Sequence, residues 1–443
     1  MGYLFFRRVI VIILTIVLIQ TGVAFAQDRD SKTITLKDAV TMAVSKNVLI
    51  REAVENQKAA LEEEKAAKKD FLPKASASYS YLRFKDRPYF MFNEGVVAKV
   101  DMGPKDNYHW DVTLTQPIFT GFALSTKRKM AKLGVDIKGL EREQAILDVT
   151  KQVKVAYYNI LLAKKFLTVA YEAVSQLKSH VNDAVKFYKH GIIPYNDTLK
   201  SQVALANAIQ NGIKVESSVE MAISSFNTLL RIDIDTETAA EDLLVVEPYT
   251  FDQGLLFDEA MTNRPELKVL RLALMQADYT IRLTKSSYYP QVALVARYEQ
   301  NGDNPRAGDN DFQNDHNASI VVQAKWTFFE WGKKGADTKK YYHERLSLAE
   351  KVKGIEDSIR LEVKNAFVNL RVADKNIETA KGSLTQAQEN YRITNLQYQQ
   401  QMTTSTEVLD ARMLLTQAET NYYSALYGYM LSLAELERAV GKG

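Results

Sequence analysis

Four segments of this chain alternate apolar and polar side chains with a period of two. They cover residues 75–81, 110–115, 292–298 and 317–326, with aromatic residues near their ends. This pattern predicts β-strands with one apolar and one polar face. Such strands either cross a membrane with the polar face toward a lumen or lie half-buried in a soluble sheet. Alternation alone favours the second setting.

Two long stretches of the chain contain no proline. One lies between Pro117 and Pro194, and the other extends from Pro305 to the C-terminus. Proline interrupts helix interiors, and Ala, Leu, Lys, Glu and Gln dominate both stretches, so continuous helices are predicted. A helix of about 65 residues would reach roughly 100 Å.

The chain also contains an internal repeat. Residues 148–230 match residues 358–440 at an offset of 210, whereas nearer the N-terminus the offset is 217, as for Pro73 and Pro290. The difference of seven residues predicts a shorter loop in the second strand hairpin. We interpret the chain as a tandem duplication of a unit of about 210 residues, each unit with two strands between helical parts.

The predicted strands have a consequence for assembly. If they cross a membrane, they cannot do so alone, because an open sheet edge cannot lie in lipid. Small barrels of one chain begin at about eight strands, so several chains would have to pool their strands. Three chains of four strands each would supply twelve. Membrane strands would therefore require an oligomer.

Residues 1–26 indicate export. Arg7 and Arg8 precede an apolar run, Val9–Ile19, and the triplet Ala24–Ala26 has small residues at its first and third positions. This arrangement is typical of a cleaved secretory signal peptide, and a retained N-terminal membrane anchor is the alternative. The chain has no cysteine, so packing or assembly must stabilise the exported protein.

Composition narrows the classes of function. The 443 residues are 46% hydrophobic and 25% charged, which excludes a disordered tail and a bundle of membrane helices. A net charge of +3 gives no basic surface for nucleic acid. The five histidines lack ligand spacing, and no nucleophile motif or phosphate loop occurs, so neither an enzyme nor a cofactor or metal site is expected. Residues 86–107 and 301–317 are rich in Asp, Asn, Gly and Pro and are predicted to be long solvated loops.

Short motifs recur in the same order in both halves of the chain. They are an opening helix signal, two helix-to-strand junctions and two strand-to-helix junctions: Thr35–Val40 with Asn47, Phe71–Pro73, Tyr288–Pro290, Gln116–Gly121 and Trp326–Gly332. Together with the duplication and the two hairpins, they resemble the TolC-type outer-membrane efflux family over nearly all of the mature chain.

This resemblance implies a mainly α-helical protein with a membrane β-barrel. A trimer would form a twelve-strand barrel in the outer membrane, in contact with its lipid and continuous with a periplasmic α-helical barrel. The first repeat would cover residues 27–231, with its β-hairpin at about 74–118. An equatorial linker, 232–260, would precede the second repeat, 261–443, with its hairpin at about 290–327. The implied function is a passive exit duct for efflux or type I secretion, which binds a periplasmic adaptor and an inner-membrane pump.

The resemblance also implies a periplasmic tip where the helix pairs turn. The turns are expected at His190–Pro194 and Gln400–Thr404, which coincide under the offset of 210. The residues expected to dock the adaptor are Gly191, Ile192, Ile193, Pro194, Gln401, Met402 and Thr403. Two positions depart from the family pattern: Gln401 replaces a usual glycine, and Thr403 replaces a basic residue that locks the tip in some members.

The family closes this tip with carboxylates just past the second turn. Glu407 and Asp410 share one helix face and would form rings of like charge in a trimer. Asp197 is the offset equivalent of Glu407, and Tyr398 lies where the family often has a tyrosine that ties neighbouring helices. Asp410 lies further from the helix start and fits a cap less well, but the other three residues have simpler structural interpretations. Thr404 and Glu407 fit a capping box, Asp197 a first-turn dipole partner, and Tyr398 ordinary packing.

A periplasmic coiled-coil adaptor or scaffold is the alternative function. It would account for an exported chain with long helices. It would not account for the four alternating segments or their duplication.

Overall fold

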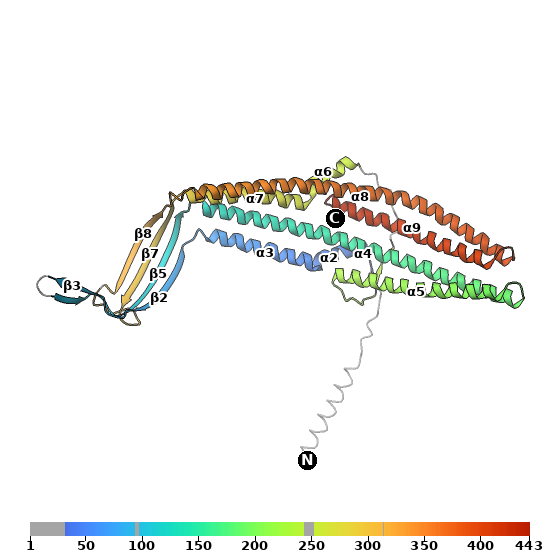
Figure 1. Cartoon of the computed structure of the whole chain (residues 1–443), viewed down its shortest axis with the longest axis horizontal. Helices are drawn as coiled ribbons and strands as arrows, with labels where there is room; N and C mark the ends of the chain where they lie inside the picture. The colour runs from blue at the N-terminus through green and yellow to red at the C-terminus, as the bar shows by residue number, and fades with distance from the viewer. Residues whose placement is uncertain (1–31, 94–96, 243–251, 313) are drawn as a thin grey trace, which may run out of the picture.

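The computed structural model describes residues 32–93, 97–242, 252–312 and 314–443. The described chain is elongated, with a small β-sheet at one end and helices that extend from it to the opposite end (Figure 1). The predicted signal peptide lies outside the described residues.

The sheet has four antiparallel strands in the order β2-β5-β7-β8. Their bounds are β2 Lys74–Arg83, β5 Asp106–Phe119, β7 Gln291–Gly302 and β8 His316–Lys325. The central strands β5 and β7 join the two halves of the chain. In the described part of the chain, no further strand pairs with the outer edge of β2 or β8.

The pairing register gives this sheet one apolar and one polar face, because successive residues of a strand point to opposite sides. Rows of partners on one face are Ala75–Leu114–Ala296–Ile320 and Ala77–Val112–Tyr298–Ala318; rows on the other are Ser76–Thr113–Arg297–Ser319 and Ser78–Asp111–Glu299–Asn317. On the apolar face, Ile320 is 77% exposed. Figure 1 shows the helices beyond the end of the sheet rather than over it. The described chain therefore leaves the apolar face uncovered.

The first hairpin loop differs from the irregular loop expected for residues 86–107. It contains a second antiparallel hairpin, β3 Tyr89–Asn93 with β4 Val97–Asp101. The ammonium of Lys99 lies over the ring of Tyr89, 4.2 Å from its centre. Five-residue strands are too short for their alternation to stand out among turn-forming residues.

In each half of the chain, a very long helix is followed by a shorter helix in which the chain runs back. Helix α4 Ala123–Lys189 is followed by α5 Tyr195–Leu230, and α8 Lys333–Gln399 is followed by α9 Ser405–Ala439. Both α4 and α8 contain 67 residues, so each extends about 100 Å. They run from the sheet to the tip, the end of the molecule formed by the α4–α5 and α8–α9 turns (Figure 1). Within the described ranges, none of the helices combines the length and apolar character that a bilayer crossing requires.

Shorter helices complete the half of the molecule nearer the sheet. They are α2 Leu36–Lys46, α3 Val48–Lys69, α6 Gln253–Asn263, α7 Pro265–Lys285 and the 3₁₀ helix η2 Ser286–Tyr288. The break between α2 and α3 lies at Asn47, whose Oδ1 accepts a hydrogen bond from Leu49 N at 2.9 Å and whose Nδ2 donates to Leu229 O at 3.3 Å. Helix α7 begins with Pro265. Proline suits the first helical position because a backbone N–H there would have no intrahelical partner, so its absence from proline costs nothing.

The element bounds follow the two sequence offsets. Helices α2 and α6, helices α3 and α7, and strands β2 and β7 begin 217 residues apart. Strands β5 and β8, and the helix pairs α4–α8 and α5–α9, begin 210 residues apart. The change of seven residues therefore falls between the two strands of each hairpin.

Buried apolar side chains gather at mid-length, where helices from both halves meet. There β1 Lys32–Ile34 pairs in parallel with β6 Thr238–Ala240, which lies within the expected equatorial linker. The fully buried Tyr157 of α4 shares its hydroxyl hydrogen between Ile34 O at 3.1 Å and Glu241 O at 2.9 Å. This tyrosine therefore ties the two-stranded pair to the long helix.

A partly buried ion cluster joins α7 to α4, α8 and α9 at the same level. Glu266 of α7 accepts hydrogen bonds from Arg264 Nη2 at 3.2 Å and from Arg438 Nη2 of α9 at 2.6 Å. Arg264 also donates to Glu362 of α8 at 2.6 Å, and Arg438 to Asp148 of α4 at 2.5 Å. Burial by itself would raise the pKa of Glu266, but the two guanidinium groups outweigh it and lower that pKa to about 2.

The strand-to-helix turns place two residues each in the left-handed region. These are Gly121 and Phe122 before α4, with φ of 60° and 69°, and Trp331 and Gly332 before α8, with φ of 48° and 84°. A Cβ on Gly121 would lie 2.5 Å from Ser286 O, whereas a Cβ on Gly332 would have nothing within 4 Å. Only the first turn requires glycine for space as well as for φ.

These two glycines form a matched pair for a stability measurement. Gly332→Ala is expected to lower the free energy of unfolding by about 1 kcal/mol, the strain of a left-handed alanine. Gly121→Ala adds the contact with Ser286 and is expected to cost about 2–3 kcal/mol. Thermal unfolding of the purified variants measures both. Equal losses would contradict the close approach at Gly121.

Candidate functional site

The two turns at the tip have the same main-chain hydrogen bonds. The bonds are Gly191 N to Tyr188 O (2.8 Å) and Ile192 N to Phe187 O (2.9 Å) in the first turn, and Gln401 N to Tyr398 O (2.9 Å) and Met402 N to Gln397 O (2.8 Å) in the second. They satisfy the last carbonyls of α4 and α8, as in many helix C-termini. Ile192 and Met402 are exposed, Met402 to 76%. Both turns thus present an apolar side chain to solvent at the end of the molecule.

Gly191 and Gln401 both adopt the left-handed conformation, with φ of 74° and 62°. Glycine does so without strain, whereas a side chain with a Cβ does not. Gln401→Gly is therefore expected to raise the free energy of unfolding by about 1 kcal/mol, and Gly191→Gln to lower it by a similar amount. Midpoints of thermal unfolding test both. A stabilising Gly191→Gln would contradict the assignment of strain to this conformation.

The expected gate carboxylates lie near the start of α5 and in the first two turns of α9. Glu407 and Asp410 are exposed, and Glu407 N donates to Thr404 Oγ1 at 3.3 Å. The capping interaction of Thr404 is thus present. Asp197, in the first turn of α5, is partly buried and lies 3.5 Å from Lys200 Nζ.

Tyr398 is buried between helices rather than exposed at the surface of the tip. Its ring centre lies 4.7 Å from that of His180 and 5.4 Å from that of Phe187, both on α4. Burial raises the pKa of its hydroxyl, and the charges of Asp197 and Asp183 act in the same direction. The tyrosine therefore packs the second helical hairpin, α8–α9, against the first, α4–α5.

A hydrogen-bonded cluster beside Tyr398 was not among the features predicted from the sequence. His180 Nε2 lies 2.8 Å from Ser405 Oγ, which lies 3.0 Å from Ser201 Oγ, and the three side chains come from α4, α9 and α5. All three residues are buried. A single histidine in a helix and two serines more than 200 residues apart form no motif, so only the fold brings them together.

A second polar cluster is centred on Arg412, two residues after Asp410 in α9. The buried Arg412 of α9 donates to Gln176 Oε1 of α4 at 2.6 Å and to Glu419 Oε2 at 3.0 Å. Its guanidinium also lies over the ring of Tyr391 of α8, 5.7 Å from the ring centre. Burial raises the pKa of Glu419, with the charge of Glu172 acting in the same direction and Arg412 opposing it. One arginine thus connects three helices close to Asp410.

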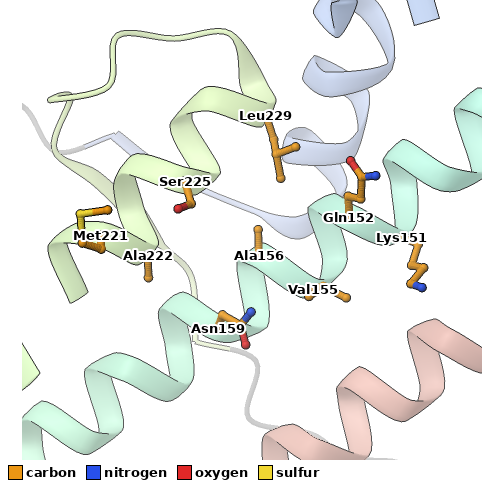
Figure 2. A pocket seen from close by; sticks show the side chains of 9 residues that line it. All are labelled: Lys151, Gln152, Val155, Ala156, Asn159, Met221, Ala222, Ser225 and Leu229. Carbon is orange, nitrogen blue, oxygen red and sulfur yellow. The ribbon is translucent and has the colours of Figure 1, made fainter. Parts of the chain in front are cut away.

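An open hollow of about 470 Å³ lies between α4 and α5 near mid-length, well away from the tip (Figure 2). Its lining is mainly apolar: Leu229 and Ala222 of α5 face Ala156 of α4 (Figure 2). Its one charged residue, Lys151, pairs with Glu435 of α9 at 2.6 Å. In the described residues, no group of three or more His, Asp or Glu side chains could hold a metal ion.

A family model described as outer membrane efflux protein matches residues 39–230 and 256–442 of the chain. Outer membrane protein TolC of Escherichia coli K12 is 20% identical over 322 residues, which cover 68% of this chain and 64% of TolC. The match thus spans less than two thirds of that relative. TolC of Vibrio cholerae is 20% identical over 327 residues, 72% of each chain.

Solved structures with the same fold are outer membrane channels. The Campylobacter jejuni CmeC channel superposes with a TM-score of 0.76 at 15% identity, covering 94% of this chain and 87% of CmeC. The OprN channel gives 0.77 at 15% identity, covering 92% and 90%. The open state of the Neisseria gonorrhoeae MtrE channel gives 0.72 at 17% identity, covering 92% and 89%.

Proposed function

The chain belongs to the outer membrane efflux protein family, and we propose that it is the outer-membrane exit duct of a tripartite efflux or type I secretion system. The observation that carries this proposal is a four-stranded sheet with one uncovered apolar face, at the end of helices about 100 Å long. Such a sheet suits lipid on one side and a watery lumen on the other.

The duct is a homotrimer in this proposal. The edges of β2 and β8 are open, and an open edge cannot lie in lipid, so β8 of one chain pairs with β2 of the next. Three copies then close a twelve-strand barrel in the outer membrane. The polar face lines its lumen, where Arg297 Nε donates to Thr113 Oγ1 at 3.2 Å. Below the barrel, helices α4, α5, α8 and α9 of each chain form an α-helical barrel in the periplasm, and the two halves of the chain derive from a duplicated unit.

The tip is the gate and the docking end of this duct. Glu407 and Asp410 are exposed on the first turns of α9, so in a trimer each forms a ring of three carboxylates that attracts cations into a narrow pore. The exposed apolar turns, with Ile192 and Met402, bind the periplasmic adaptor. The duct is a passive conduit, and the inner-membrane pump supplies the energy for transport.

Single-channel conductance in a planar bilayer tests this function. The detergent-purified protein is expected to give small, cation-selective openings. In the Glu407→Ala, Asp410→Ala double variant, the conductance should rise roughly twofold or more and cation selectivity should fall, because two rings of like charge are removed from the narrowest part.

Asp357→Ala provides the control, since Asp357 is an exposed carboxylate of α8 far from the tip, paired with Arg360 at 3.6 Å. It should conduct like the original protein. Large openings that the double variant leaves unchanged would move the gate elsewhere. A water-soluble elongated particle without conductance would overturn the duct and favour a periplasmic scaffold.

A further inference from the structure

Four helices meet in one buried polar cluster near the tip, which we call the tip latch: His180 of α4, Ser201 of α5, Tyr398 of α8 and Ser405 of α9. None of the four residues is more than 3% exposed. They are buried within a single chain, without any contribution from a neighbouring copy. The latch is therefore a link between the α4–α5 and α8–α9 hairpins of the same chain.

One assignment of donors makes all three hydrogen bonds of the latch at once. Ser201 Oγ donates its single hydrogen to Asp197 O at 2.9 Å. Ser201 must then accept from Ser405 Oγ, at 3.0 Å, and Ser405 must accept from His180 Nε2–H, at 2.8 Å. This assignment places a hydrogen on Nε2, and burial of the ring favours its neutral form. Its Nδ1 is buried and has no hydrogen-bond partner in the described part of the chain.

The surroundings of the ring disfavour a positive charge. Burial lowers the pKa of His180, and Asp183 of the same helix opposes this effect without reversing it. Asp183 itself lies 3.4 Å from Lys186 Nζ. Tyr398 of α8 faces the ring as a neutral phenol, and Ser405 of α9 carries no charge. On α5, Asp197 acts on Tyr398 and pairs with Lys200 at 3.5 Å.

We propose that this latch holds the two hairpins of each chain together in the closed duct, and that protonation of His180 at Nδ1 releases them. His180 acts here as a positioning residue, because it touches the helices that carry the gate and not the cargo. The inference rests on the proposed duct function. It supplies an uncharged lock at the tip.

The direction of the pH effect follows from linkage. In an opened tip the ring contacts water, and its pKa returns toward the ordinary value of about 6.5. The closed tip binds the proton more weakly, so its advantage is complete above about pH 6.5 and decreases as the pH falls below that value. The equilibrium should shift toward the open tip by up to about tenfold per chain for each pH unit, until the closed form is also protonated.

Conductance of the full-length protein as a function of pH tests the latch. Between about pH 7.5 and pH 5, the open probability of the original channel should rise. His180→Gln keeps a donor near the position of Nε2 but cannot take up the charge, so its open probability should be flat over this range. His343→Gln, at an exposed histidine near the start of α8 and far from the tip, should respond to pH like the original protein. An unchanged pH response in His180→Gln overturns the proposal.

A reversible cross-link tests the latch without removing the histidine. The chain has no cysteine, and Ser201 Oγ and Ser405 Oγ are 3.0 Å apart, so the Ser201→Cys, Ser405→Cys double variant places two thiols side by side. Oxidised, this variant should stay closed at pH 5; reduced, with the serine relay lost, it should open about two- to tenfold more often than the original protein at pH 7.5. Acid-induced opening of the fully cross-linked form overturns the latch. A complete lack of conductance in the original protein would instead overturn the duct.

Discussion

Arg412→Met is expected to lower the free energy of unfolding by about 3–5 kcal/mol, the largest single effect that this structure predicts. The variant fills a similar volume but leaves Glu419 buried without its partner at 3.0 Å. Because burial already raises the pKa of Glu419, the unpaired carboxyl should take up a proton at higher pH than in the original protein. Thermal unfolding at pH 7 measures the loss.

Two further variants separate the buried charge from other causes. Arg412→Met combined with Glu419→Leu removes both charges and should recover most of the stability, since apolar pairs of similar size often replace buried ion pairs without loss. Arg360→Met removes an exposed arginine that pairs with Asp357 and should change stability by less than about 1 kcal/mol. A double variant no more stable than Arg412→Met would contradict the explanation.

Acid should weaken the junction at mid-length through Glu266. Its pKa is about 2 in the folded chain and 4.5 ordinarily, so the carboxylate contributes stability that is complete above about pH 4.5 and is lost as the pH falls toward 2. A difference of this size corresponds to about 3 kcal/mol. Unfolding midpoints between pH 7 and pH 2.5 should therefore fall with a component that Glu266→Gln lacks.

The matched control for this prediction is Glu389→Gln. Glu389 also pairs with an arginine, Arg392 at 2.7 Å, but both side chains are exposed to solvent. Solvent and salt screen such a pair, so its loss should leave the acid dependence nearly unchanged. If Glu266→Gln kept the full acid dependence of the original protein, the two guanidinium groups would not be the cause.

Regular elements of this chain were predictable because they repeat a simple pattern many times. Alternation over about ten residues predicts strands near 74–118 and 290–327, and the structure has β2, β5, β7 and β8 there. The long helices follow in the same way from the absence of proline. The β3–β4 hairpin was missed, because five-residue strands give too few alternations to distinguish them from a polar loop.

The clusters near the tip could not be predicted for a different reason. His180 is 225 residues from Ser405, and Arg412 is 236 residues from Gln176. Local spacing identifies pairs on one helix, such as Glu407 and Asp410, but not contacts between helices from opposite halves of the chain. Such contacts depend on helix registry, which the sequence alone leaves open.

Helices α4 and α8 have the same length, 67 residues each. Both helices start beside the same sheet, so equal residue counts bring both turns to the same depth. Seven extra residues in one helix would carry its turn about 10 Å beyond the other and leave one hairpin projecting alone. A duct that must reach a more distant partner therefore has to lengthen both helices together, each matched by its returning helix.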